Sequence, residues 1–207
     1  MPARRWILPA LVGFLVLAGC GPDDGRNLAD PDPDLTAVPV ATTTPATIDD
    51  PDPELSTTGP GGVELRGTGF GPGENLPLES GCGGPTSPGL TWTAPPRRAT
   101  ELALVAQDVD GDGAVQFLVT GMSPDTLQIP RGGPLESGEV RQNSTGTTTW
   151  TSPCPQDGFA HRIVFTLYLL DGPLPEGAAD TASVVDTIRN TAFGEATVLA
   201  RAPIPEG

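Results

Sequence analysis

The chain has 207 residues, of which 26 are acidic and 11 basic, giving a formal net charge of −15 at pH 7. A field of this sign repels polyanions, which excludes nucleic acid and anionic lipid surfaces as electrostatic partners. The length is enough for one domain with a single core, together with segments that have little structure of their own.

The first twenty residues have the features of a lipoprotein signal. Two arginines precede the apolar run WILPALVGFLVLAG, and the tetrad LAGC that ends at Cys20 resembles the bacterial lipobox. We expect a signal peptide over residues 1–19 and lipidation of Cys20, palmitate included, which anchors the chain to a bacterial cell membrane on the extracytoplasmic side. An uncleaved anchor and simple secretion are the alternatives. No later segment is long and apolar enough to span a membrane, so the lipid is the only membrane contact we expect.

Residues 20–62 have the composition of a tether. They are rich in Asp, Pro, Thr and Gly, and the motif DPDPDL at Asp30 recurs as DPDPEL at Asp50. Such a segment cannot bury enough apolar surface to offset its ordering entropy, so we predict a disordered linker. Cleavage of the signal leaves nine basic and all 26 acidic residues, a formal charge of −17.

Residues 63–207 are predicted to form one mainly β domain. Three runs indicate buried strands: TELALVAQDVD from Thr100, VQFLVTGM from Val115 and HRIVFTLYLLD from His161. Each run is short, apolar, rich in β-branched residues and bounded by Gly, Pro or Asp, as buried strands are.

The one good helix candidate lies near the C-terminus, over residues 177–196. Ala182, Val185, Ile188 and Ala192 recur near helical spacing, and Asp180 can cap the first turn. Helix is therefore expected only in the C-terminal part of the domain.

Two cysteines remain after Cys20 is lipidated, namely Cys82 and Cys154. Disulfides persist in exported compartments, so we favour a bond between them, which would close a loop of about 70 residues and contribute roughly 4 kcal/mol. Two free thiols or a metal pair are the alternatives. A metal would need ligands that the single histidine, His161, can hardly supply.

Four ordered blocks carry a family resemblance: CGGPTSPGLTW (82–92), LALVAQDVD (102–110), RQNSTGTTTWTSPCPQDGFAHR (141–162) and FTLYLLD (165–171). In order and spacing they resemble the phosphatidylethanolamine-binding protein family, and in particular its bacterial Raf-kinase-inhibitor-like branch. The resemblance covers about residues 63–201. It implies a Greek-key β-sandwich of two antiparallel sheets with a short C-terminal helix.

The resemblance also implies a small anion-binding pocket at one end of the sandwich. Carried over by position, its residues are Asp108, Gln116, Ser152, Pro153, Pro155 and His161. Gln116 stands where the family usually has a histidine, and Ile163 where it usually has a tyrosine. We expect His161 to orient or contact the ligand rather than to act as a general base.

These departures weaken the donors available to an anion. A neutral amide such as Gln116 is a weaker donor than an imidazolium, and Ile163 replaces a hydroxyl with an apolar wall. We therefore predict a modified pocket for a small anionic or polar ligand, including phosphate-containing ones. The alternative is a degenerate pocket on an interaction or inhibitor module with a protein partner at the cell envelope.

Other chemistry fits the sequence less well. The motif DVDGDG at Asp108 starts like a calcium loop, but its twelfth position is Val119 instead of a glutamate; a tight turn with unusual dihedrals at Gly111 and Gly113 is the preferred interpretation. We expect neither metal nor cofactor.

Nucleophilic chemistry has two candidate sets, Cys154 with His161, or Ser152 with His161 and Asp108. Neither has a nucleophile elbow, so we predict no enzyme, with a hydrolase as the minor alternative. Asn143 opens the glycosylation pattern NST, a pathway that a bacterial lipobox argues against. Trp92 and Trp150 are predicted to belong to the core or its rim.

Overall fold

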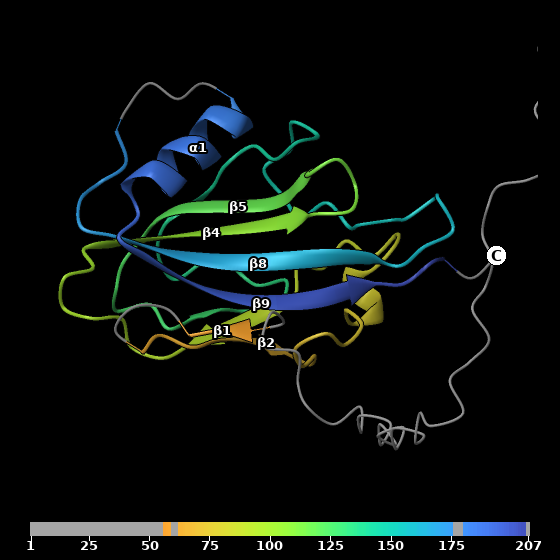
Figure 1. The fold of residues 1–207 in the computed structure, drawn as a ribbon, viewed down its shortest axis with the longest axis horizontal. Coiled ribbons are helices and arrows are strands. Elements are labelled where there is room, and N and C mark those ends of the chain that lie inside the picture. Colours follow the sequence, from red (N-terminus) through yellow and green to blue (C-terminus); the bar gives the residue numbers. More distant parts are fainter. Residues whose placement is uncertain (1–55, 59–61, 176–179, 206–207) are drawn as a thin grey trace, which may run out of the picture. The chain divides into compact units, whose positions relative to one another are not determined.

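The computed structural model of the chain describes residues 56–58, 62–175 and 180–205, all of which belong to the unit that spans residues 47–207. The predicted signal peptide (1–19), Cys20 and almost all of the predicted tether (20–62) lie outside the described residues. The described part of the predicted domain (63–207) contains two antiparallel sheets and one α-helix (Figure 1).

The larger sheet has six strands and the smaller one three. The larger sheet consists, in spatial order, of β1 (Ser56–Thr57), β9 (Gly194–Ala202), β8 (His161–Leu170), β4 (Glu101–Asp108), β5 (Val115–Met122) and β7 (Glu139–Val140). The smaller sheet consists of β2 (Leu65–Thr68), β3 (Gly89–Trp92) and β6 (Gln128–Ile129). Two further elements are the 3₁₀-helix η1 (Leu78–Ser80) and the helix α1 (Thr181–Thr191). The predicted β-sandwich with a short C-terminal helix is confirmed.

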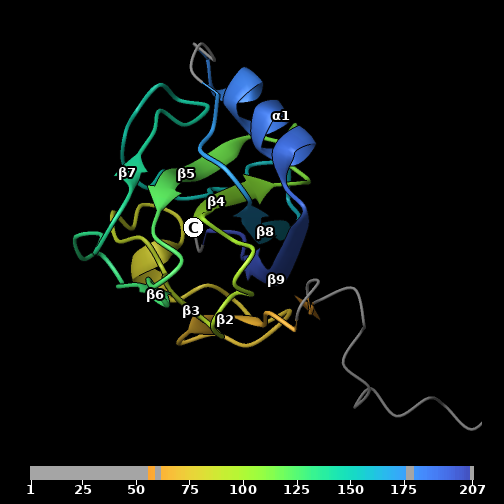
Figure 2. The same ribbon diagram turned by 90° about the vertical axis from the view of Figure 1, so that its left-hand side faces the viewer.

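The elements form three layers, with the larger sheet in the middle (Figure 2). Strand β4 is apolar almost throughout because both of its faces are covered. Leu102, Leu104 and Ala106 belong to the core cluster between the two sheets, whereas Ala103 and Val105 belong to a second cluster under α1. Successive strand side chains point to opposite faces, so a strand covered on both faces reads as a continuous apolar run. The three predicted strand runs correspond to β4, β5 and β8.

Helix α1 begins where the sequence indicated but ends earlier. The Asp180 carboxylate accepts a hydrogen bond from the Ser183 amide at 2.9 Å, which is the predicted cap. The helix ends at Thr191, and the predicted helix to Ala196 is wrong because residues from Gly194 onward form β9. Strand β9 pairs with β8 along its whole length, and these ladder hydrogen bonds outweigh the local helical spacing.

The buried face of α1 also differs by one position. Val184, Val185 and Ile188 are buried, whereas Ala182 is exposed. The larger valine side chain therefore supplies the contact with the sheet that the spacing assigned to Ala182.

Both predicted core tryptophans are buried, with 5% and 6% of their surface exposed for Trp92 and Trp150. The Trp150 ring stacks on Phe165 with a centroid distance of 6.2 Å, and its indole N–H donates to the Ser80 carbonyl. The Trp92 indole N–H donates to the Thr126 carbonyl at 2.9 Å. Trp150 thus joins the core to η1, and Trp92 joins it to the loop between β5 and β6.

Candidate functional site

A cleft of about 490 Å³ opens at the end of the sandwich where β4 ends and β8 begins. The six side chains predicted for the ligand site all line this cleft: Asp108, Gln116, Ser152, Pro153, Pro155 and His161. Further lining residues are Asp110, Asp112, Thr145, Thr151, Gln156 and Asp157. The structure therefore brings the predicted set together, although the set comes from three strands and a loop.

His161 and Asp108 form a buried pair at the back of the cleft. Strand pairing places Asp108 opposite Ile163, two residues after His161, so the two side chains meet where β4 ends and β8 begins. The imidazole Nδ1 lies 2.8 Å from Asp108 Oδ2, and the two residues are 8% and 5% exposed. Asp108 Oδ1 accepts backbone hydrogen bonds from Asp110 and Gly111. The carboxylate is thus fixed on both oxygens, and it orients the imidazole.

The turn after β4 makes room for this carboxylate. A Cβ on Gly111 would lie 2.6 Å from Asp108 Oδ2, so no larger residue fits there without moving Asp108. The unusual dihedrals predicted for this turn occur at Asp112 and Gly113, with φ of 54° and 70°. Gly111 therefore serves the close approach, and the prediction of an unusual dihedral there is wrong.

Asp157 contacts the opposite side of the imidazole. His161 Nε2 lies 3.1 Å from Asp157 Oδ2, and the Asp157 side chain is 54% exposed. Hydrogen bonds to Asp108 first, and then to Asp157, raise the pKa of His161 above its ordinary value; the hydrogen bond with His161 lowers the pKa of Asp157. An imidazolium donates from both nitrogens, which suits two carboxylates. Asp157 was not among the predicted site residues, and its four-residue spacing to His161 was the only signal in the sequence.

Gln116 offers the cleft an unpartnered amide. Its side chain is 7% exposed and lines the cleft, and within the described residues it makes no side-chain hydrogen bond. It is not among the polar groups sealed from solvent, so its amide is reached from the cleft. The backbone carbonyl of Gln116 accepts hydrogen bonds from the Thr151 amide and from Asn143 Nδ2. The strand position is thereby fixed while the side chain stays available.

Asn143 holds the loop that forms one wall of the cleft. Its Nδ2 donates to the Thr149 carbonyl at 2.9 Å and to Thr151 Oγ1 at 2.8 Å, and its Oδ1 accepts from Thr145 and Thr147. The side chain is committed to this network and 2% exposed, so the NST pattern is no glycan acceptor in the folded protein. Asn143 is a structural residue of the cleft.

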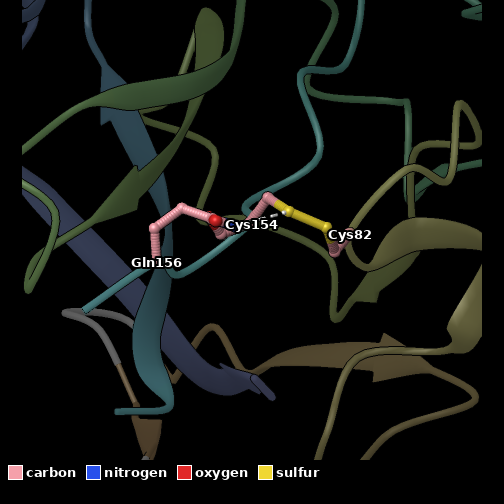
Figure 3. Close-up of a disulfide and its surroundings, with 3 residues drawn as sticks. All are labelled: Cys82, Cys154 and Gln156. Atoms are coloured by element: carbon pink, nitrogen blue, oxygen red, sulfur yellow. Dashed lines mark hydrogen bonds between the residues drawn. A yellow bond between two sulfur atoms is a disulfide. The ribbon is translucent and has the colours of Figure 1, made fainter. Parts of the chain in front are cut away.

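The predicted disulfide between Cys82 and Cys154 is present and joins this wall to the segment after η1 (Figure 3). Gln156 Nε2 donates to the Cys154 carbonyl at 3.3 Å beside the bond (Figure 3). With Cys154 committed to the disulfide, none of the described residues places a thiol nucleophile next to His161. The proposed serine triad fails as well, because carboxylates occupy both ring nitrogens and no hydrogen bond joins Ser152 to His161.

Ile163 does not belong to the cleft. Its side chain is fully buried in the core cluster between the two sheets. The prediction that Ile163 forms an apolar wall of the cleft is therefore wrong. The isoleucine that stands in place of the expected tyrosine packs in the core instead.

The charge of the cleft is negative. Four carboxylates line it, from Asp108, Asp110, Asp112 and Asp157, with His161 as the lining cation. Arg162 lies beside them, but its guanidinium holds Asp110 at 2.7 Å, and these hydrogen bonds lower the pKa of Asp110 to about 2. Within the described part of the chain, no cluster of three or more His, Cys, Asp or Glu has an arrangement that could hold a metal ion. The DVDGDG motif is a strand end and a turn.

The three-layer fold and this end-on cleft define a β-sandwich protein with a small polar site. A family model described as phosphatidylethanolamine-binding protein matches residues 66–202. The chain therefore belongs to the phosphatidylethanolamine-binding protein family.

Two sequence relatives support this assignment, and one solved structure has the same fold. The Mycobacterium tuberculosis protein named "Putative lipoprotein LppC" is 33% identical over 191 residues, covering 89% of each chain. A UPF0098 protein of Methanothermobacter thermautotrophicus is 31% identical over 146 residues, covering 66% of this chain and 96% of the relative. The crystal structure of E. coli YbcL, titled a new member of the mammalian PEBP family, has a TM-score of 0.62 at 20% identity and covers 69% of this chain and 99% of YbcL. Among the described residues, no helix has the length and apolar character needed to cross a membrane.

Proposed function

We propose that this protein binds a small polar ligand in the cleft and that the Gln116 amide makes hydrogen bonds to it. The observation that carries the proposal is the Gln116 side chain, which is 7% exposed, lines the cleft and has no hydrogen-bond partner among the described residues. A hydrogen bond from a ligand to this amide, made in place of one to water, contributes about 0.5–1.5 kcal/mol net.

The other walls suit a ligand of modest size. The hydroxyl of Thr151 and the Ser152 side chain lie along one wall, the rings of Pro153 and Pro155 stiffen it, and the disulfide at Cys154 holds it in place. A site held by fixed loops needs less ordering when the ligand binds, which favours affinity. The proposed role is binding, with no catalytic residue.

We further propose that the domain is held at the cell envelope through a lipid on Cys20. The LAGC tetrad supports this, and so does the name of the mycobacterial relative, which covers 89% of this chain. Mass spectrometry of the N-terminal peptide would test it. A diacylglyceryl adduct on Cys20, absent after Cys20→Ala, is the expected result, and an unmodified N-terminus upstream of residue 20 would contradict it.

The binding proposal is tested by calorimetry and by NMR of the Gln116 side-chain amide in the mature chain, with the disulfide intact. The probes are glycerol, ethylammonium, acetate and inorganic phosphate. At least one probe should shift the Gln116 signals saturably, and Gln116→Ala should weaken its binding about tenfold through the lost hydrogen bonds. The matched control is Gln128→Ala, an exposed glutamine that hydrogen-bonds Glu136 away from the cleft. If Gln116→Ala and Gln128→Ala bind every probe as the wild type does, the cleft is not the site.

A second function has one observation in its favour. Four exposed apolar side chains lie near the cleft end: Leu78, Val109, Phe159 and Ile204, with exposures of 89%, 41%, 72% and 48%. Val109 follows β4, and its amide donates to the Arg162 carbonyl at the start of β8. Ile204 follows β9, whose last residue, Ala202, pairs with His161, and Leu78 belongs to η1 beside the disulfide. Such a surface suits an envelope protein partner with an apolar face. Photocrosslinking from position 159 in the native envelope should capture one partner in stoichiometric amount, and Leu78→Ser should abolish this crosslink. If no partner is captured while ligand binding is intact, the partner-binding function is wrong and the ligand-binding proposal stands.

A further inference from the structure

Asp157 lies in a loop that has little other support. Residues 156–160 are exposed, and within this loop Gly158 has φ of 88° and the Phe159 amide donates to Asp157 Oδ1 at 3.1 Å. The contact of Asp157 with His161 is the hydrogen bond that joins this turn to the strands, as far as the described residues go. A small self-contained turn thus presents one carboxylate to the outer nitrogen of the only histidine.

We infer that Asp157 determines the charge class of the ligand, so that the cleft accepts a ligand with an ammonium or amidinium group and rejects free oxyanions. The inference rests on the proposed binding function and names the ligand chemistry of the same cleft. Two independent observations support it: the four carboxylates around the cleft, and the unpartnered Gln116 amide that is more than nine-tenths buried and faces the cleft.

An oxyanion would compete with the protein's own carboxylates for His161. An oxyanion needs the outer N–H of the imidazole, because Asp108 occupies the inner one at 2.8 Å. Asp157 already occupies the outer N–H and is part of the same chain, so its effective concentration exceeds that of a millimolar solute. An oxyanion must therefore displace a carboxylate, and afterwards the two negative charges remain near each other.

The charged groups around the cleft are mostly carboxylates. Asp108 contacts the imidazole from β4, Asp110 and Asp112 come from the turn after β4, and Arg162 follows His161 on β8. Arg162 compensates Asp110 through hydrogen bonds of 2.7–3.2 Å. Within the described residues Asp112 makes no ion pair. The groups that face a bound ligand thus carry more negative than positive charge, which repels oxyanions and attracts cations.

A cationic ligand would find hydrogen-bond acceptors in the cleft. A carboxylate has about four lone-pair sites, so Asp157 can accept from an ammonium while it still accepts from His161. Its 54% exposure leaves it accessible to solutes. The Gln116 side-chain carbonyl can accept a further hydrogen bond from the same group or from a neighbouring hydroxyl. A cationic ligand therefore adds interactions without displacing one.

The test uses the mature chain with two probes, ethylammonium chloride and sodium phosphate, at pH 7 and matched ionic strength. The imidazole signals of His161 report binding without assignment ambiguity, since the sequence has one histidine. In the wild type, ethylammonium should bind more tightly than phosphate. In Asp157→Asn, ethylammonium binding should weaken and phosphate binding should strengthen, each by about two- to fivefold, the size expected for a half-exposed charge pair. Asp112→Asn should weaken ethylammonium binding in the same way.

The matched control is Asp125→Asn, which removes the same charge from an exposed position between β5 and β6, at the far end of the sheet. It should leave both affinities unchanged. If the wild type prefers phosphate, or if Asp157→Asn and Asp125→Asn behave alike while Gln116→Ala still weakens binding, the inference about Asp157 is wrong and the cleft function stands. If no probe of either charge binds to any variant, and glycerol and acetate also fail, both proposals fall.

Discussion

The disulfide offers a prediction whose magnitude follows from the chain connectivity. Cys82 and Cys154 are separated by 72 residues, and the enclosed loop contains β3, β4, β5, β6 and β7. Closing a loop of this length in the unfolded chain contributes about 4 kcal/mol in the chain-entropy model. Both cysteines are exposed, so serine at these positions creates no cavity. The double variant Cys82→Ser with Cys154→Ser should therefore lose most of this free energy of unfolding.

For a domain of this size each kcal/mol shifts Tm by about 2–4 °C, so we expect a fall of about 8–16 °C by scanning calorimetry. Wild-type protein reduced with dithiothreitol should unfold at the temperature of the double variant, which controls for the serine side chains. The His161 imidazole signals should broaden in the double variant, because Cys154 anchors the cleft wall. A fall of less than about 3 °C in both samples would refute the reasoning.

Three further predictions concern the cleft. Gly111→Ala should push the Asp108 carboxylate away from the imidazole, so the pKa of His161, measured by NMR titration, should fall. Gly172→Ala is the control, because no atom lies near its added methyl group, and it should leave this pKa unchanged. Equal His161 pKa values in the two variants would contradict the close-approach role of Gly111. The pKa of His161 is raised by folding, so its pairing stabilises the protein fully below about pH 6.5 and is lost as pH rises through the folded pKa. The free energy of unfolding in urea should lose this contribution between pH 5.5 and pH 8.5, and His161→Gln should remove that difference. Asn143→Ala should cost at least about 2 kcal/mol in the same assay, because it breaks a buried network; a loss below about 0.5 kcal/mol would count against that role.

Local sequence patterns were sufficient for much of the fold. Apolar runs bounded by turn residues predicted β4, β5 and β8, and a capping aspartate predicted the start of α1 at Thr181. They were insufficient for β9, whose first residues match helical spacing. That segment becomes a strand because β8 pairs with all of it, from Gly194 opposite Leu169 to Ala202 opposite His161. Pairing with a distant strand is not encoded in the local period.

The candidate site divides in the same way. Its composition was predictable, since the resemblance assigned six residues that the structure brings to one cleft. The contacts of His161 were not, because Asp108 is 53 residues away and Asp157 lies on a turn whose direction depends on Gly158. The replacement at Ile163 was placed in the cleft by analogy, but the alternation of β8 directs it into the core.

The sequence alone therefore determined the class of fold, favoured the pairing of Cys82 with Cys154 and supplied the residue types available to a polar site. Only the tertiary structure decided that two carboxylates flank the imidazole and that the cleft is negative. The physical reason is that strand register and turn geometry select which side chains meet, and both depend on burying the two faces of the larger sheet at once.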